Sequence, residues 1–371
     1  MPSIVDRAVL RPGERIRVLV VDDSVVIRRL VTHALSEDPA LEVAGSAANG
    51  ALALDRIAQL NPDVVTLDIE MPVMDGLEAL RRIRKQYPRL RVIMFSTLTE
   101  RGAAATFEAL ALGADDYVTK AANAGSLDRS MENLRRELVP KIRQFFAFAG
   151  DGAAAAVSKR TPPAVLRPVA PAAIYPPRKV LAVGVSTGGP TALAEIIPKL
   201  PADLPVPVLI VQHMPPLFTR LLAERLQAHS ALPVEEARDG VPVEAGRVLI
   251  APGDYHMRVR REGAKVVARL DQGPMENSCR PAVDVLFRSV EEVYGGAALA
   301  VVLTGMGQDG LRGCERLKAS RACILAQDEA SSVVWGMPGA VVSAGLADMT
   351  VGLSDMPAEI LRRLGRGNAI Q

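Results

Sequence analysis

Two long stretches of the chain alternate short runs of apolar, β-branched residues with segments whose apolar residues recur at helical spacing. Apolar runs in the first stretch lie at Val18–Val21, Val43–Ser46, Val64–Ile69, Val92–Ser96 and Tyr117–Thr119. Such runs, alternating with amphipathic helices, predict βαβ units around a parallel sheet. We therefore expect an α/β domain with five parallel strands and about five helices over residues 17–138.

A change in composition separates the two stretches. Residues 150–178 are dense in Ala and Pro, and such a segment cannot bury enough apolar surface to fold alone. We expect residues 139–178 to hold a helix end and a linker, and residues 1–16 to be a disordered extension.

After the linker the alternation resumes and predicts a second α/β domain, doubly wound and mostly parallel, over residues 179–366. Its strand candidates are Val180–Val185, Val206–Gln212, Val248–Ala251, Val259, Lys265–Leu270, Ala298–Thr304 and Cys323–Ala326. Helices are expected to follow Gly189, Phe218, Ala282, Gly310 and Gly336.

Composition excludes several classes of protein. The 371 residues carry a net charge of +2, so nothing demands a nucleic acid or an anionic membrane as partner. The three cysteines show no C-x-x-C spacing, which suits a reducing compartment. No apolar run of about 18 residues lacks charges and breakers, and the N-terminus has no apolar signal core. We expect a cytoplasmic protein.

Polar side chains end several predicted strands of the first domain. Asp22 and Asp23 follow the first strand, and Asp68 ends the third. The carboxyl ends of parallel strands meet at one crevice, where three carboxylates would repel one another without a hard cation such as Mg²⁺. Ser96 and Lys120 end the fourth and fifth strands. Each residue alone fits a solvated turn or a helix cap, but together they predict a site for a cation and an anion.

Over residues 17–138 the chain resembles the receiver domain of two-component response regulators, a flavodoxin-like fold. The matching stretches are VVDDS (20–24), LDIEMPVMDG (67–76), MFSTL (94–98) and DYVTK (116–120). The resemblance implies that Asp68 is the phosphoacceptor. It also implies that Mg²⁺ is held by Asp22, Asp23, Asp68 and the backbone carbonyl of Glu70.

The same resemblance implies that Ser96 and Lys120 contact the phosphoryl group and that Tyr117 is the switch residue. Nucleophilic attack by a carboxylate, with a cation and a lysine offsetting the charge on the transferred group, is consistent with these residue types. One departure is Ala121, which follows the lysine where receivers usually have proline.

In the second domain, the stretch VGVSTGGP (183–190) follows an apolar run and precedes a helical segment. A glycine-rich turn at this place can bind phosphate through backbone N–H groups. It can also hold a nucleophilic serine, because it fits G-x-S-x-G. No lysine follows Gly189 and the spacing is not G-x-G-x-x-G, so the phosphate-binding alternative is the weaker one.

Ser186, His213 and Asp309 each follow a predicted strand. If these strands are parallel, the three residues share one sheet edge and form the set that a hydroxyl nucleophile needs. Each alone is more simply a helix cap, a structural histidine or a turn residue. His256 lies in a turn-rich segment without a matching partner. The order Ser, His, Asp differs from that of α/β-hydrolases, which place the acid before the histidine.

Residues 179–350 resemble the catalytic domain of chemotaxis protein-glutamate methylesterases, the CheB family. The matching stretches are GVSTGGP (184–190), VQHMP (211–215), LIAPGDYHM (249–257), CRPAVDVLF (279–287), LTGMGQDG (303–310) and VWGMPGA (334–340). The resemblance implies Ser186 as nucleophile, His213 as general base and Asp309 as its orienting carboxylate. Thr187 and the backbone of Met306 would lie near the oxyanion, and this domain would need no metal.

The implied activity is hydrolysis of glutamate γ-methyl esters on the cytoplasmic helices of chemoreceptors, with release of methanol, and deamidation of receptor glutamines. A chemotaxis histidine kinase would supply the phosphoryl group, and phosphorylation at Asp68 would open the Ser186 crevice. We expect a monomer recruited to receptor arrays that binds no nucleic acid. Two alternatives are an inactive module that binds receptor tails and a DNA-binding regulator, although the second domain lacks a concentrated basic face.

Overall fold

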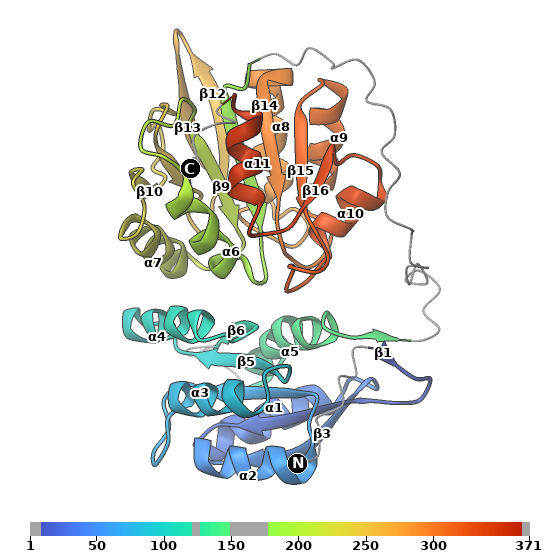
Figure 1. The fold of residues 1–371 in the computed structure, drawn as a ribbon. Coiled ribbons are helices and arrows are strands. Elements are labelled where there is room, and N and C mark those ends of the chain that lie inside the picture. The colour runs from blue at the N-terminus through green and yellow to red at the C-terminus, as the bar shows by residue number, and fades with distance from the viewer. Residues whose placement is uncertain (1–8, 121–126, 149–176, 366–371) are drawn as a thin grey trace. The chain divides into compact units, whose positions relative to one another are not determined.

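The computed structural model describes residues 9–120, 127–148 and 177–365. The chain divides into two compact units, Met1–Ala173 and Ile174–Gln371 (Figure 1). Three sequence predictions fall on segments outside the described residues. They concern the first eight residues, Ala121 and most of the linker, residues 149–176. Among the helices that are described, none is long and apolar enough to cross a membrane.

The first unit is built on a five-stranded sheet in which every neighbouring pair is parallel. Its order is β3 (Leu41–Ala47), β2 (Ile16–Val21), β4 (Val64–Asp68), β5 (Arg91–Ser96) and β6 (Asp116–Thr119). This is the flavodoxin-like order, and it confirms the predicted fold. The helices are α1 (Val25–Ser36), α2 (Gly50–Leu60), α3 (Gly76–Gln86), α4 (Glu100–Ala111) and α5 (Leu127–Arg143).

Side-chain caps begin the first four helices close to the ends of the strands. The caps are Ser24, Asn49, Asp75 and Thr99, and each accepts a hydrogen bond from a backbone N–H in the first turn of its helix. Such caps satisfy N–H groups that have no partner within the helix. They therefore fix short loops at the sheet edge that carries the carboxylates.

The prediction that residues 1–16 are disordered is wrong for the part that the structure describes. β1 (Val9–Leu10) pairs in parallel with β7 (Ala147–Phe148), and Leu10 is fully buried. A two-residue strand is too short to show a periodic pattern, and its partner follows the last helix of the unit. Pairing between distant segments of this kind leaves no local sequence signal.

The second unit contains a seven-stranded sheet, again parallel throughout. Its order is β10 (Val234–Glu236), β11 (Val248–Ile250), β9 (Val208–Gln212), β8 (Val180–Val185), β14 (Ala298–Val302), β15 (Cys323–Gln327) and β16 (Met349–Val351). The helices are α6 (Gly189–Ile196), α7 (Pro216–Gln227), α8 (Val283–Tyr294), α9 (Leu311–Ala319), α10 (Met337–Ser343) and α11 (Met356–Arg363). The doubly wound, mostly parallel architecture is confirmed.

A separate antiparallel hairpin joins β12 (His256–Glu262) to β13 (Lys265–Asp271). The sequence indicated β13, but of β12 only Val259, because alternating arginines interrupt its apolar residues. The short edge strands β10 and β16 were missed as well. Three residues of mixed polarity at a sheet edge do not form a recognisable run.

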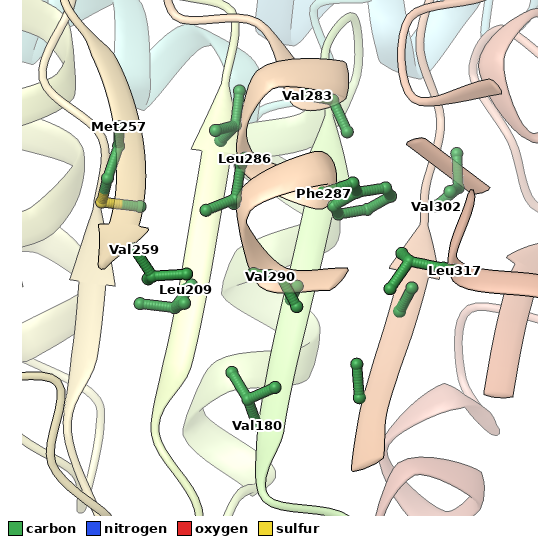
Figure 2. Close-up of a cluster of buried hydrophobic side chains, with 14 of the residues drawn as sticks. Val180, Leu209, Met257, Val259, Val283, Leu286, Phe287, Val290, Val302 and Leu317 are labelled. Atoms are coloured by element: carbon green, nitrogen blue, oxygen red, sulfur yellow. The ribbon is translucent and has the colours of Figure 1, made fainter. Parts of the chain in front are cut away.

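One core cluster of the second unit lies between one face of the sheet, helices α8, α9 and α10, and the β12–β13 hairpin (Figure 2). Alternate strand residues such as Val180, Leu209 and Val302 point into it, as expected for a pleated strand. From α8, Val283, Leu286, Phe287 and Val290 pack against them. These α8 residues recur at helical spacing, so the helix lies with one apolar face on β8 and its neighbours.

Phe287→Ala should lower the free energy of unfolding of the second unit by about 3–5 kcal/mol, because Phe287 is fully buried and the truncation leaves a cavity. The single tryptophan, Trp335, belongs to this unit, so its fluorescence during urea unfolding reports on this unit. Met349→Ala, at a 42% exposed side chain, is the control and should change stability by less than about 1 kcal/mol. Equal effects of the two substitutions would contradict the described core.

Candidate active site and phosphorylation site

Three carboxylates converge at the carboxyl edge of the first sheet. Asp22 and Asp23 follow β2, Asp68 ends β4, and one oxygen from each lies within 4.8 Å of the others. Asp22 and Asp68 are buried, whereas Asp23 is exposed. Three hard oxygen donors at one point, one of them open to solvent, fit Mg²⁺, which keeps waters and takes few protein ligands.

Lys120 lies in the same crevice. Its Nζ is 2.9 Å from Asp22 Oδ2 and 2.8 Å from Asp68 Oδ2, and the side chain is only 20% exposed. Burial raises the pKa of Asp68 to about 6, although the hydrogen bond and positive charge of Lys120 act against that rise. The Lys120 ammonium group therefore stabilises the negative charges of Asp22 and Asp68.

Two further predicted residues, Ser96 and Tyr117, lie on β5 and β6, and neither side chain is exposed. The Ser96 hydroxyl donates to the Gly102 carbonyl at 3.0 Å and accepts from Thr106 Oγ1 at 2.6 Å, so it is bound to α4. The Tyr117 ring is buried, and Lys141 Nζ lies 4.9 Å from its centroid. Ser96 is thus at the predicted edge, with its hydroxyl engaged by the neighbouring helix.

Glu70, predicted to offer its backbone carbonyl to the metal, directly follows the Asp68–Ile69 pair. Its side chain is exposed, and Oε1 lies 3.6 Å from Arg101 Nε. The side chain is therefore turned to solvent, and the role of the carbonyl stays a prediction.

In the second unit, Ser186, His213 and Asp309 come from three neighbouring strands. Ser186 follows β8, His213 follows β9, and Asp309 lies beyond β14, while β8 pairs with both β9 and β14. The backbone continues this pairing past the strand ends, because His213 N–H donates to the Val185 carbonyl at 3.2 Å. The sheet therefore brings the three residues to one edge.

His213 and Asp309 are in direct contact. His213 Nε2 lies 2.8 Å from Asp309 Oδ2, with side-chain exposures of 12% and 2%. An Nε2–H donated to the carboxylate leaves Nδ1 as the ring nitrogen that can accept a proton. In the part of the chain that the structure describes, no hydrogen bond joins the Ser186 hydroxyl to His213.

The Asp309 carboxylate lies at the amino end of α8. Oδ2 also accepts from Val283 N–H at 2.7 Å, and Oδ1 accepts from Asp284 N–H and Gly310 N–H, both at 3.0 Å. Burial works against the charged carboxylate, but hydrogen bonds and the charge of His213 outweigh it and lower the pKa of Asp309. A buried anion held by helix N–H groups has a fixed position and a stable charge.

The charge state of the His213 ring is set by two neighbours. Burial by itself lowers the pKa of His213, but the interactions of the ring with Cys279 and with the Asp309 carboxylate raise it above the ordinary value of 6.5. The arrangement therefore stabilises an imidazolium, which is the form that a general base takes after it accepts a proton.

Ser186 lies in a turn whose backbone conformation requires glycine at position 188. The next helix, α6, begins at Gly189, and its cap residue Gly188 has a φ of +78°. A Cβ on Gly188 would lie 2.6 Å from a methyl group of Val333. Ser186 N–H donates to the Thr304 carbonyl, and its own carbonyl accepts from Gly189 N–H. The half-buried serine is thereby held at the amino end of a helix.

Of the two residues predicted near the oxyanion, Thr187 lies in this turn and Met306 lies in the loop after β14. Thr187 is 7% exposed, and Met306 is 41% exposed. Gly305, next to Met306, approaches the serine so closely that a Cβ there would lie 2.7 Å from Ser186 Cβ. Met306 therefore lies next to the turn of Ser186, and its side chain faces solvent.

Asn277 is a site residue that the sequence analysis missed. Its Nδ2 donates to Asp309 Oδ1 at 2.8 Å and to Asp284 Oδ2 at 3.0 Å, so it joins two buried carboxylates. Asn277 has a φ of +52°, a conformation that asparagine tolerates better than most residues. No sequence signal distinguishes it, because it lies in an irregular loop. His256 is buried and bonded to Pro274 O and Ala282 N, as a structural histidine is.

Two family models match the chain. The CheB methylesterase model matches residues 181–360, and the response regulator receiver domain model matches residues 18–132. A protein-glutamate methylesterase/protein-glutamine glutaminase of Trichodesmium erythraeum is 50% identical over 95% of this chain and 99% of its own length. One of the same name from a Nocardioides species is 53% identical over 96% of each chain.

Among solved structures, the chain is similar to the CheB methylesterase catalytic domain of Thermotoga maritima, with a TM-score of 0.49 and 42% identity. The match covers 50% of this chain and 98% of that one. The two sequence relatives span both units at high identity. The chain therefore belongs to the family of protein-glutamate methylesterases/protein-glutamine glutaminases that carry a receiver domain.

Proposed function

We propose that the chain is a phosphorylation-activated hydrolase that removes the γ-methyl groups of glutamate esters on chemoreceptor helices and deamidates receptor glutamines. The observation that carries this proposal is the 2.8 Å contact between His213 and Asp309 beside the Ser186 turn. The names of the relatives support the same two activities. Chemoreceptors and a histidine kinase are the substrate and the phosphodonor of the proposal.

The proposed chemistry is acyl transfer. His213 Nδ1 takes the Ser186 proton as the hydroxyl attacks the ester carbonyl, and the protonated ring then gives that proton to the departing methanol. Water hydrolyses the acyl-enzyme by the same exchange and frees the glutamate carboxylate. With glutamine as substrate the leaving group is ammonia, so one triad serves both reactions.

Two features stabilise the charges that this reaction develops. Asp309 stays negative and fixed, which supports the transient imidazolium of His213. On the other side, the turn of Thr187 and the backbone near Met306 border the serine, and α6 begins three residues after it. Backbone N–H groups at such a place stabilise a tetrahedral oxyanion.

The receiver supplies the proposed regulation. Asp22, Asp23 and Asp68 would hold Mg²⁺, which neutralises the phosphoryl oxygens when bound. Asp68 attacks the phosphorus atom and displaces the histidine of the kinase, and Lys120 pairs with the charge of the transferred phosphoryl group. The Ser96 hydroxyl would then leave Gly102 and Thr106 for the phosphoryl group, and this exchange would move α4 and Tyr117. Phosphorylation would thereby raise the population of molecules in which the Ser186 site is open to substrate.

Ser186→Ala should lower methanol release from methylated receptors by roughly 10⁴- to 10⁶-fold, because no other group can form the acyl-enzyme. Ser289→Ala is the matched control, since Ser289 lies in the middle of α8. Its hydroxyl donates to the Leu286 carbonyl and accepts from Val259 N–H. Substantial methanol release by the Ser186 variant would remove it from the proposed role.

Asp68→Asn should abolish the stimulation of methanol release by a small phosphodonor with Mg²⁺ and leave the basal rate unchanged. An amide cannot attack phosphorus, and it keeps the size of the carboxylate. Asp55→Asn, on the exposed side of α2, is the control and should be stimulated like the parent. Stimulation of the Asp68 variant would contradict the phosphoacceptor assignment.

The rate of ester hydrolysis should rise with pH to a midpoint above 6.5, because His213 must lose its proton to act as a base and its pKa is raised. Cys279→Ala should move the midpoint of kcat/KM to lower pH, since the interaction with Cys279 that raises the pKa of His213 is removed. Cys314→Ala, on the buried face of α9, should leave the midpoint in place. An unchanged midpoint in the Cys279 variant would refute this coupling.

The same shift has a consequence for stability. The folded pKa of His213 lies above its unfolded value, so the protonated ring stabilises the unit fully below pH 6.5. This contribution is lost as the pH rises through the folded pKa.

A further inference from the structure

Gln212 is the last residue of β9 and directly precedes His213. Its side chain is 2% exposed. Burial of a primary amide is costly unless its donors and acceptor find partners. The hydrogen-bond partners of Gln212 therefore indicate the role of this buried side chain.

The amide nitrogen of Gln212 bridges the two catalytic loops. Nε2 donates to the backbone carbonyl of Ser186 at 2.9 Å and to that of His213 at 3.3 Å. One planar NH₂ group thus contacts the main chain of both the proposed nucleophile and the proposed base. Its reach spans the gap between β8 and β9 just beyond the last paired residues, Val185 and Gln212.

The oxygen of the amide has no hydrogen-bond partner among the residues that the structure describes. Gln212 Oε1 is buried and accepts no hydrogen bond from the described residues. A flipped amide would direct this oxygen at two carbonyl oxygens, so the observed orientation is the only one that donates to both. An unsatisfied buried acceptor costs about 1–3 kcal/mol, and a buried group of this kind calls for an explanation other than stability.

Gln327 provides the contrast within the same sheet. It ends β15, as Gln212 ends β9, and is fully buried. Its Oε1 accepts from Thr304 N–H and its Nε2 donates to Ser331 O, both at 2.8 Å. A buried glutamine at a strand end in this fold can therefore satisfy both ends of its amide.

The turn of the nucleophile is shaped around Gln212. A Cβ on Gly189 would lie only 1.9 Å from Gln212 Oε1. The amide therefore packs directly against the start of α6, and glycine at position 189 makes room for it. The side chain fixes the turn sterically as well as through its hydrogen bonds.

We infer that Gln212 is a positioning residue that sets the spacing between Ser186 and His213. The inference rests on the proposed function, because it assumes that these two residues react with each other. Its specific consequence is a separation of effects: loss of the amide slows the chemical step and does not weaken the fold.

The test uses the full-length chain with Gln212→Met, which keeps the volume and removes both polar ends. We expect kcat for methanol release to fall about 10- to 100-fold through misplacement of reacting groups. KM should stay unchanged, since no substrate contact is removed. The melting temperature read from Trp335 fluorescence should change little, because removal of the unpaired Oε1 offsets the loss of the two donated hydrogen bonds. Labelling of Ser186 by a fluorophosphonate probe should slow in the same proportion as kcat.

Two companion variants keep the outcome unambiguous. Gln212→Asn keeps an amide that is too short to bridge both carbonyls, so it should also lose kcat even if the methionine variant fails to fold. Ser289→Ala removes a buried hydrogen bond distant from the triad and should lower the melting temperature without changing kcat.

Each contrary result has one meaning. Wild-type kcat in both Gln212 variants, with Ser186→Ala inactive, would overturn the positioning role alone. A fall in activity that only follows a fall in melting temperature would make Gln212 a structural residue and would also overturn it. Activity retained in Ser186→Ala would instead overturn the proposed function.

Discussion

The Asp309 carboxylate is the interaction on which the catalytic unit depends. Its two oxygens accept five hydrogen bonds, from His213, Val283, Asp284, Gly310 and Asn277. An anion this buried is stable only if its partners hold it on every side. Those partners join the start of α8, the loop after β14 and the loop that contains Asn277. The charge that orients His213 therefore also ties together three segments of the fold.

Both units place their chemistry at the carboxyl edge of a parallel sheet, yet they handle negative charge differently. In the receiver, three carboxylates converge and Lys120 pairs with two of them, an arrangement that suits a hard cation and a phosphoryl group. In the esterase, backbone N–H groups and the Asn277 amide surround the Asp309 carboxylate, and its charge supports an imidazole. Loops at such an edge converge from neighbouring strands, which explains why one architecture can hold either set of polar groups.

How far the sequence predicts the fold depends on the length and burial of each element. The strands that contain Val183, Leu67 and Val301 are buried on both faces, and such strands form apolar runs that can be recognised locally. The short strands β1, β10 and β16 could not be recognised, because two or three residues carry no period. The site follows the same division: Ser186, His213 and Asp309 end or follow long strands, whereas Asn277 lies in an irregular loop.

By itself, the sequence determined the two α/β domains, their order, and the residue types at the strand ends, because hydrophobic periodicity and motif spacing are local properties. Only the tertiary structure decided which imidazole nitrogen faces Asp309, that Ser96 is bound to α4, and that the Gln212 amide bridges the loops of Ser186 and His213. These are orientations of side chains across segments distant in sequence. They depend on how neighbouring strands and helices pack, and packing is not encoded within any single stretch of the chain.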